Sequence, residues 1–558
     1  MLLDRFNSVK DIKRLHTIAS TMAKYGFSDA VHRMGLGALL EKLGSKLHMP
    51  TVVARAKMTT PQRICHVFID LGPTFVKLGQ VLATRVDIFP PDWIEEFKKL
   101  QDQVPALPYK TIKQVIIQEF NGEPRKIFKT FDAKPVAAAS IGQAHKATLD
   151  DGTEVIVKIM RPGIEEVIAA DLRLIQRLAK MAGDRMGEIK QIDPVRIARE
   201  FSDSLSREID LSMEAKNLEK VGEKFQNDKN IVIPKAYWDY TTKRVITQEC
   251  INGIPGKDIQ EAKEAGIDTS VIAKIGTEAI LKMIFRDGFY HADPHPGNTF
   301  YLKGNKLALI DFGMVGRLNA KHRDEIVSLL YGIASEDVPS ILRVLEGWIV
   351  SDDVNLDDLE ADVEIFVEQY HDLNLENLNL STMLQDLTKI LRMHNVVLPS
   401  SLTLLIKVFI TLEGFGRLLD PKLNMLDLAR PYLKKEVMKR YSPKAVKMKA
   451  MHLATEYINF AEDLPTDLRR LLKIARVQGL KIRMDESALN RILKNMSRGA
   501  NRISSSLIIA AFIIASGLLM TVESPSGFWV PFLTIAGFSL SGLGVIGLLI
   551  SMWRNRKG

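Results

Sequence analysis

The chain of 558 residues is poor in cysteine, and its first residues are poor in apolar runs. Its two cysteines, Cys65 and Cys250, belong to no CxxC pair and to no Cys/His metal-binding spacing. A reduced cytosolic compartment fits this usage, and no structural zinc site is visible. The first twenty residues, MLLDRFNSVKDIKRLHTIAS, lack the continuous apolar core of a signal peptide. They predict a basic amphipathic helix instead.

The formal net charge of +9 does not indicate nucleic-acid binding, because much of the basic excess lies in one segment, residues 469–502. Apolar side chains alternate with cations there, just before a hydrophobic stretch. We expect these cations to lie against anionic membrane lipids, at about 1 kcal/mol each. A solvated helix face is the alternative interpretation.

Two long segments without charged residues, 504–522 and 528–552, stand near the C-terminus. Each is long enough to span a bilayer, for which about 20 apolar residues are needed. The connection between them, Glu523-Ser-Pro-Ser-Gly, allows only an antiparallel hairpin. Cations flank the pair on both outer sides and are missing from the connection. The positive-inside rule therefore predicts a multi-pass membrane protein whose body faces the cytoplasm.

Small residues in the second segment would let the two helices pack closely or pair with another copy of the chain. They are Gly537, Ser541, Gly542 and Gly544. A homodimer through these helices is therefore one expected partner arrangement. A buried hydrophobic hairpin in a soluble core is the alternative to membrane insertion.

The stretch HADPHPGN, residues 291–298, is followed by an apolar strand pattern that ends in Asp311-Phe-Gly. Two strand-like runs about Gly304-Asn305 lie between them and predict a β-hairpin. This hairpin would bring Asn298 and Asp311 together. An aspartate, an asparagine five positions later, and a DFG triplet after a short hairpin are typical of protein kinases. Carboxylate and amide oxygens hold Mg²⁺ against nucleotide phosphates, and a further carboxylate orients the attacking hydroxyl.

We therefore expect Asp293 to be the catalytic aspartate and Asn298 and Asp311 to be Mg²⁺ ligands, with ATP as the nucleotide. His291 and His295 have a spacing that suits zinc on a helix. Pro294 and Pro296 argue against a helix there.

A strand pattern upstream, Glu154-Val-Ile-Val-Lys158-Ile, carries a lysine among β-branched residues. Kinases place a phosphate-binding lysine in this context, so Lys158 is the candidate. The loop before it contains Ala137, Ala138, Ala139 and Ser140 where kinases have glycines. Alanine does not take positive φ as glycine does, so we expect a stiffer loop over the nucleotide.

Residues 206–217 predict a helix with Asp210 and Glu214 on one face, near a cation such as Lys158 or Mg²⁺. A solvated acidic face is the alternative. The strand pattern 244–249 ends in a glycine turn where the hinge between two kinase lobes belongs. Glu249 and Ile251 are therefore candidate nucleotide-binding residues.

With these passages, the chain resembles the UbiB/AarF/ADCK family of atypical kinases, which is associated with ubiquinone biosynthesis. The resemblance rests on KLGQ at 77–80, PVAAASIGQAH, EIDLSMEAKN, HADPHPGN with DFG, and LQDQVP at 100–105. It covers roughly residues 60–315, and the C-terminal hairpin suits the bacterial, inner-membrane branch of the family.

The resemblance implies several roles. Lys77, Gly79 and Gln80 match the KxGQ signature on a helical extension that crosses the active site. Glu208 and Asp210 match the ExD signature that meets it, and Glu214 matches the partner of the strand lysine. A covered site would suit small or lipid-like substrates, or ATP hydrolysis, better than extended peptides. The implied partners are membrane lipids and quinone-biosynthesis proteins or quinone precursors.

The expected fold is α+β, a two-lobe kinase-like fold with an N-terminal helical extension and a C-terminal transmembrane hairpin. The expected divisions are an extension (1–125), an N-lobe (126–252), a C-lobe (253–440), a basic juxtamembrane segment (441–503) and two transmembrane helices (504–553). Two other functions stay open: a small-molecule kinase of the aminoglycoside or choline type, which also uses an HxDxHxxN loop, and a nucleotide-switched lipid-binding scaffold without phosphotransfer.

Overall fold

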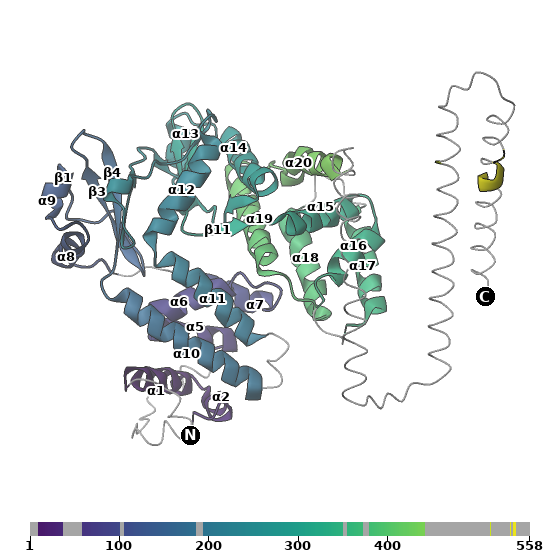
Figure 1. Cartoon of the computed structure of the whole chain (residues 1–558), viewed down its shortest axis with the longest axis horizontal. Helices are drawn as coiled ribbons and strands as arrows, with labels where there is room; N and C mark the ends of the chain where they lie inside the picture. The colour runs from purple at the N-terminus through teal and green to yellow at the C-terminus, as the bar shows by residue number, and fades with distance from the viewer. Residues whose placement is uncertain are drawn as a thin grey trace. The chain divides into compact units, whose positions relative to one another are not determined.

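The structure is a computed structural model that describes residues 9–36, 58–100, 105–185, 193–349, 354–371 and 379–440, together with 514, 536 and 539–542. The chain divides into two units, Met1–Val446 and Lys447–Gly558. The first unit holds the helices and strands from α1 to α20 that Figure 1 labels.

Two features expected near the C-terminus lie outside the described residues. They are the basic segment 469–502 and, apart from the few positions above, the hairpin segments 504–522 and 528–552. Within the described residues, no helix is long and apolar enough to cross a membrane. The juxtamembrane segment and the hairpin therefore stay predictions.

A five-stranded antiparallel sheet forms the first lobe, in the order β1-β3-β4-β6, with β2 paired to β3. Its strands are β1 (Thr130–Phe131), β2 (Ala137–Ala138), β3 (Gly142–Thr148), β4 (Glu154–Met160) and β6 (Val245–Glu249). One face packs against α8 (Tyr109–Phe120) and α9 (Pro124–Ile127), which lie at one end of the first unit (Figure 1). The predicted strands around residues 154–159 and 244–249 are confirmed.

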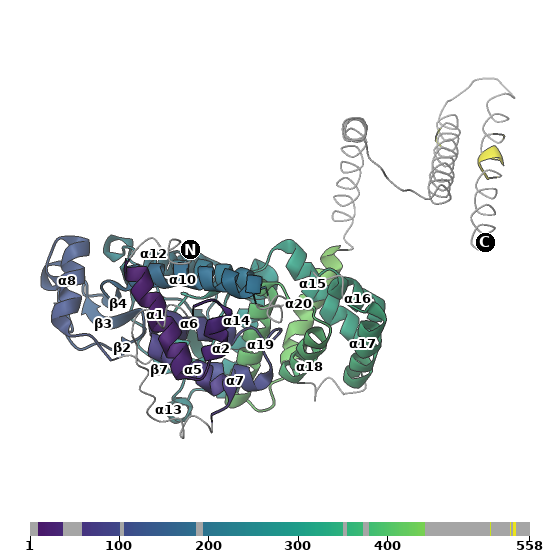
Figure 2. The same ribbon diagram turned by 90° about the horizontal axis from the view of Figure 1, so that it is seen from below.

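Helices of the extension lie beside two long helices of the first lobe. The extension contains α1 (Val9–Lys24), α2 (Ser28–Arg33), α5 (Thr60–Leu71), α6 (Pro73–Leu82) and α7 (Pro91–Lys98). α1 and α6 contact α10 (Ile164–Arg185), and α6 also contacts α11 (Pro194–Glu208). Figure 2 shows α1 and α6 beside α10 from a second direction. A shared core of buried side chains, including Leu15, Phe75 and Phe201, joins the two groups.

The second lobe is mostly helical and surrounds two small sheets. The four-stranded sheet has the order β5-β10-β9-β7 and the two-stranded sheet pairs β11 with β8. These strands are β5 (Ile231–Val232), β7 (Ile254–Pro255), β8 (Phe289–His291), β9 (Thr299–Leu302), β10 (Lys306–Leu309) and β11 (Val315–Arg317). The antiparallel pairing of β9 with β10 confirms the predicted hairpin. Gly304 and Asn305 in its turn have φ of 77° and 55°, values that glycine and asparagine tolerate best.

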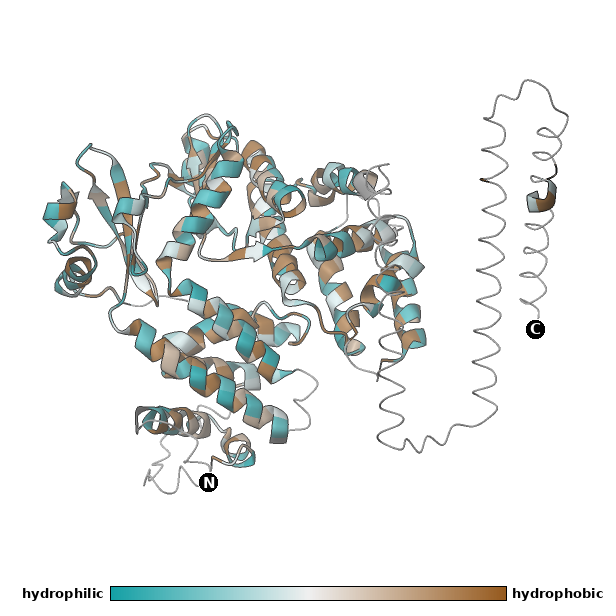
Figure 3. Cartoon of the chain, viewed as in Figure 1, coloured by the Kyte–Doolittle hydropathy of each residue, from teal (hydrophilic) through white to brown (hydrophobic). Residues whose placement is uncertain are grey.

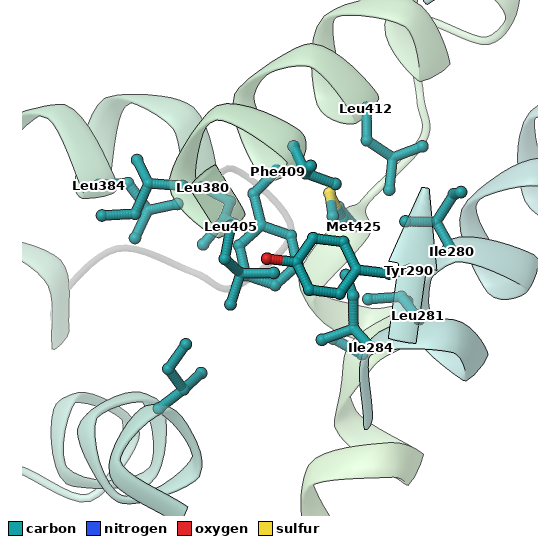
Figure 4. Close-up of a cluster of buried hydrophobic side chains, with 14 of the residues drawn as sticks. Ile280, Leu281, Ile284, Tyr290, Leu380, Leu384, Leu405, Phe409, Leu412 and Met425 are labelled. Atoms are coloured by element: carbon teal, nitrogen blue, oxygen red, sulfur yellow. The ribbon is translucent and has the colours of Figure 1, made fainter. Parts of the chain in front are cut away.

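The helices of this lobe are α12 (Leu211–Phe225), α13 (Ile259–Glu264), α14 (Thr269–Leu281), the π-helix η4 (Lys282–Asp287), α15 (Ala320–Ala334), α16 (Val338–Glu346), α17 (Leu356–His371), α18 (Leu380–Met393), α19 (Ser400–Leu419) and α20 (Met425–Arg440). Apolar and polar bands alternate along most of them (Figure 3), as expected for helices that bury one face. Their apolar faces form the largest core of the molecule. Part of that core surrounds Tyr290 of β8 (Figure 4).

One local prediction is wrong. Residues 206–217 do not form a single helix, because α11 ends at Glu208 and α12 begins at Leu211. Asp210 is the N-cap of α12, and its carboxylate accepts hydrogen bonds from the Ser212 backbone N–H (3.1 Å) and hydroxyl (2.6 Å). A capping aspartate satisfies amide groups that would otherwise lack partners. The chain therefore turns between Glu208 and Glu214, and each carboxylate is presented from its own helix.

Candidate active site

A buried ion pair joins the first lobe to α12. β4 buries Val155, Val157 and Ile159 on one face and presents Lys158 on the other. The Lys158 Nζ atom lies 2.5 Å from Glu214 Oε1. Burial alone would lower the pKa of Lys158, but the charges of Asp311 and Glu214 outweigh it and raise that pKa. Lys158 is therefore a fixed cation facing the space between the lobes.

Burial, together with the negative charge of Asp311, raises the pKa of Glu214 although its ion pair with Lys158 opposes the change. The Glu214 side chain is only 8% exposed. A carboxylate this buried is stable as an anion only beside a cation. Lys158 and Glu214 thus depend on each other.

Asp311 follows β10 and lies 3.3 Å from Lys158, measured from Oδ2 to Nζ. Its φ of 62° is in the left-handed region, which aspartate adopts more readily than most residues. The Gly313 N–H donates to its other oxygen at 3.2 Å. The charge of Lys158 lowers the pKa of Asp311, against the effect of burial. Its side chain is 46% exposed, which makes it the most open of the paired acids in the cavity.

The catalytic-loop residues begin where β8 ends, at His291. The His291 ring is fully buried and packs on Phe312, with ring centroids 4.9 Å apart. Burial lowers its pKa to about 4, so the ring is neutral at pH 7. Its Nδ1 accepts the Asp293 N–H at 3.4 Å. His291 therefore contacts both the backbone of the catalytic loop and the phenylalanine of the DFG triplet.

Asn298 is tied to both sides of the site. Its side-chain N–H donates to the backbone carbonyl of Asp293 at 3.2 Å. The backbone carbonyl of Asn298 accepts the Ile310 N–H at 2.9 Å. The hairpin thus brings Asn298 beside Asp311, as its sequence predicts. Because the amide nitrogen is the donor, the Asn298 amide oxygen is the atom that can bind a metal.

Two nitrogen groups approach the Asp293 carboxylate, the Lys407 ammonium and the His295 imidazole. Lys407 Nζ lies 3.1 Å from Oδ1, and His295 Nε2 lies 3.4 Å from Oδ2. Burial would raise the pKa of Asp293, but the hydrogen bond with His295 and the charge of Lys407 hold it well below its usual range. His295 Nδ1 accepts the Gly297 N–H at 2.9 Å, which leaves Nε2 to donate.

Lys407 was not found by sequence reasoning. It lies on α19, a helix whose mean character is apolar, between the buried residues Ile406 and Val408. A single lysine inside such a run is a signal of a buried or paired cation. The signal does not name the partner, which is 114 positions away.

The extension contributes a second lysine. Lys77 on α6 lies 2.6 Å from Glu208 Oε1 at the end of α11. Gly79 packs so tightly that a Cβ atom there would fall 2.2 Å from Leu100 Cδ1 and 2.9 Å from Phe68 Cδ2. Gln80 donates to the Leu100 carbonyl at 3.0 Å. Within this motif Lys77 therefore faces the site, whereas Gly79 and Gln80 fix the extension's own packing.

The alanine loop includes the short strand β2 and turns back into β3. Ala139 donates to the Gly142 carbonyl at 2.8 Å, and its own carbonyl accepts the Arg161 guanidinium at 3.0 Å. None of the three alanines has positive φ. Ser140 is buried at the turn. Arg161 also donates to the Pro105 carbonyl at 2.8 Å and so ties this loop to the chain leaving the extension.

The predicted hinge residues lie at the end of β6. Glu249 exchanges hydrogen bonds with the Lys235 backbone, and the following Cys250 N–H donates to the Glu154 carbonyl at 3.0 Å. Neither Glu249 nor Ile251 lines the cavity described next. Their nucleotide-binding role stays a prediction.

A cavity of about 330 Å³ lies between the lobes and under α6. Of the predicted site residues, it is lined by Lys77, Ala137, Ala139, Lys158, Glu208, Asp210, Glu214, Asp293, Asn298 and Asp311. Gly79, Gln80, Ala138 and Ser140 lie outside its lining. Arg207, Gln143 and His295 are lining residues that the sequence did not assign to the nucleotide site. The cavity therefore brings together charged and polar side chains from three separate parts of the chain: the extension, the first lobe and the second lobe.

The open Asp311 carboxylate and the Asn298 amide oxygen fit Mg²⁺, which prefers oxygen ligands and few protein contacts. Lys158 fits nucleotide phosphates as a fixed cation. The donor set thus suits a magnesium–nucleotide complex.

One cavity between the lobes is surrounded by a strand lysine paired with a helix glutamate, a catalytic-loop aspartate and a DFG aspartate. This arrangement defines a kinase-like protein. Family models agree. Residues 99–345 match the ABC1 atypical kinase-like domain, 363–424 match the UbiB helical domain, and 487–554 match the ABC1/UbiB kinase-like C-terminal domain.

Curated relatives extend the match over most of the chain. A "Probable protein kinase UbiB" of Marinobacter nauticus is 31% identical over 88% of this chain and 91% of its own length. An "Uncharacterized protein in hydrogenase 1 5'region" of Clostridium pasteurianum is 29% identical over 98% of this chain and 99% of its own length. The chain belongs to the UbiB/ADCK family of atypical kinases.

A solved structure of a Mycobacterium tuberculosis protein in complex with erythromycin is also similar. It is 23% identical and has a TM-score of 0.44, covering 65% of this chain and 93% of that one.

Proposed function

We propose that the chain is a MgATP-dependent phosphotransferase or ATPase that supports the biosynthesis of ubiquinone or a related isoprenoid quinone. The observation that carries the proposal is the convergence of Lys158, Glu214, Asp293, Asn298 and Asp311 on one cavity. A protein that had lost nucleotide chemistry would be under no constraint to keep all five together.

In this proposal Asp311 and Asn298 hold Mg²⁺, which neutralises phosphate charge when it is bound. Lys158, kept in place by Glu214, binds the phosphates nearer the adenosine. Asp293 orients the acceptor hydroxyl or water. Its lowered pKa makes it a hydrogen-bond acceptor that stays ionised, rather than a strong base.

The covering of the cavity supports a small acceptor. Lys77 and Glu208 both line the cavity and form an ion pair, so the extension supplies part of the cavity wall. In an open kinase site an extended peptide would need that space. A phenolic quinone precursor, a lipid-like molecule or water fits that restriction better than a protein.

We also propose that the C-terminal hairpin anchors the chain in the inner membrane, with its body in the cytoplasm. The charge-free segments and their flanking cations support this. Removal of residues 504–558 is expected to release a protein that still binds nucleotide but no longer complements a quinone-deficient strain. Full complementation by the truncated chain would make the anchor dispensable.

The direct test of the proposed chemistry is ATP turnover by the purified full-length protein. It is measured with and without phosphatidylglycerol vesicles and simple phenols, while phosphorylated products are sought by mass spectrometry. We expect Mg²⁺-dependent turnover. A protein that binds MgATP but releases neither phosphate nor phosphorylated product would instead support the nucleotide-switched scaffold.

A further inference from the structure

The acids that line the cavity differ in how their charge is balanced. Glu208 is paired with Lys77 and Glu214 with Lys158, at 2.6 and 2.5 Å. Asp210 is engaged as the cap of α12. Asp311 is the open acid, which a metal can neutralise. Asp293 is not one of the proposed metal ligands, yet it lines the same cavity as Asp311 and Lys158. Its charge is balanced by a cation of the protein itself.

That cation comes from outside the kinase-like core. Lys407 belongs to α19, within the stretch that matches the UbiB helical domain. It contacts Oδ1 of Asp293, whereas His295 contacts Oδ2. Because a different donor holds each oxygen, the carboxylate has one orientation.

The packing of α19 fixes where Lys407 lies. Leu405, Phe409 and Leu412 of α19 lie around the ring of Tyr290 (Figure 4), and all four side chains are buried. The Tyr290 hydroxyl donates to the Ser401 carbonyl at 3.2 Å. Tyr290 immediately precedes His291, so the helix and the catalytic loop are attached to the same strand.

A second contact fixes the start of α19. The Ser400 hydroxyl donates to Glu200 of α11 at 2.6 Å, and Glu200 also pairs with Arg85 of the extension at 3.1 Å. A chance surface pair has no such framework, and it contributes little because both side chains are free to move. Lys407 and Asp293 are each only 28% exposed and are held from both sides.

We propose that Lys407 is a positioning residue of the active site. It neutralises and orients Asp293, so that the terminal phosphate of a nucleotide can lie beside an aspartate without electrostatic repulsion. This inference rests on the proposed function. It means that the helical domain 363–424 supplies a residue to the active site.

A binding cycle tests the charge balance without requiring turnover. MgATP and MgADP binding are measured by calorimetry for the full-length wild type, Lys407→Met, Lys407→Arg, Asp293→Asn and the Asp293→Asn/Lys407→Met double variant. Lys407→Met leaves an uncompensated carboxylate, so MgATP affinity should fall about tenfold and MgADP affinity less, because a charge some ångströms away acts most on the nearest phosphate. Lys407→Arg keeps the cation and should stay within about twofold of the wild type.

The double variant decides whether Lys407 acts through Asp293. Once the aspartate is neutral, removing Lys407 should change MgATP affinity by less than about twofold, since the two effects are coupled and not additive. Lys389→Met, on the neighbouring α18, is the matched control for loss of a cation from the same domain and should match the wild type. Should Lys407→Met fail to fold, Lys407→Gln takes its place in the cycle.

The outcomes separate the two proposals. A wild type that does not bind MgATP overturns the proposed function and this inference with it. A wild type that binds MgATP without turnover, but shows the coupled cycle, overturns only the proposed chemistry. Equal loss of MgATP affinity on removing Lys407 in both backgrounds, or no loss in either, overturns the role of Lys407 alone.

Discussion

Two lysine–glutamate pairs reach the same cavity from different parts of the chain and differ in their surroundings. Lys158 and Glu214 meet inside the kinase core, where the glutamate is 8% exposed and Asp311 is 3.3 Å from the lysine. Lys77 and Glu208 meet where α6 of the extension touches the end of α11, and that glutamate is 25% exposed. We therefore expect the first pair to control nucleotide binding and the second to control access.

The largest effect is expected at the aspartate beside the first pair. Asp311→Asn keeps the shape but removes the charge of a proposed Mg²⁺ ligand. Mg²⁺-dependent nucleotide affinity should fall by more than the roughly 10- to 100-fold that loss of an outer-shell partner costs. Calorimetry with MgATP measures the loss, and Asp357→Asn, at an exposed position on α17, is the control. An unchanged affinity would remove Asp311 from the site.

Replacing each lysine by methionine compares the two pairs directly. Lys158→Met leaves Glu214 and Asp311 without their cation, so the free energy of unfolding should fall by about 3 kcal/mol, and MgATP binding should weaken. Lys77→Met should cost only about 1 kcal/mol, because its partner is more exposed. Denaturant unfolding measures both values.

The two lysine substitutions should also affect activity in different ways. Lys77→Met should increase phosphorylation of the chain itself or of added protein, since the site becomes more open. Equal losses of nucleotide binding in both variants would show that the pairs share one role.

A smaller effect is expected in the pH dependence of stability, because of the buried His291 ring. His291 has its pKa lowered to about 4 by burial, whereas an unfolded histidine titrates near 6.5. The unfolded chain therefore binds an extra proton as the pH falls below 6.5, and stability is lost until the folded pKa is reached. Relative to a His291→Gln variant, the wild type should lose about 2 kcal/mol of unfolding free energy between pH 7.5 and pH 5. Parallel stability curves for the two proteins would contradict a buried neutral ring.

The smallest effect on stability is expected in the alanine loop, which lines the same cavity as the two pairs. Ala139→Gly should cost no more than about 1 kcal/mol in backbone entropy. It should alter MgATP affinity more than Ala138→Gly does, because Ala137 and Ala139 line the cavity and Ala138 does not. A larger change for Ala138→Gly would place the phosphates on the other side of the loop.

Much of the kinase core is readable from sequence because its signals are local. The alternation around Lys158 indicates a strand, and Gly304-Asn305 indicates the turn that returns Asp311 to Asn298. Turn geometry and strand period depend on neighbours within a few residues. The helix break at Asp210 also has a local cause, since aspartate favours the N-cap position, but the run of helix formers around it conceals the signal.

Contacts between distant elements could not be read in this way. Lys407 meets Asp293 because α19 packs its apolar face on Tyr290, and that docking depends on the shapes of many side chains together. Gln80 and Gly79 are similar cases. A motif match places them in the active-site region, whereas the structure uses them to pack the extension on Leu100.

The most direct test of the account follows the terminal phosphate of ATP. The purified full-length protein is incubated with γ-labelled ATP, Mg²⁺, phosphatidylglycerol vesicles, a phenol and a general protein substrate, and the label is divided among phosphate, small products and protein. The expected result is Mg²⁺-dependent release to water or to a small acceptor, with little label on protein unless Lys77 is replaced. Strong labelling of the added protein by the unmodified chain would contradict it, because neither the extension nor the alanine loop would then restrict access to the site.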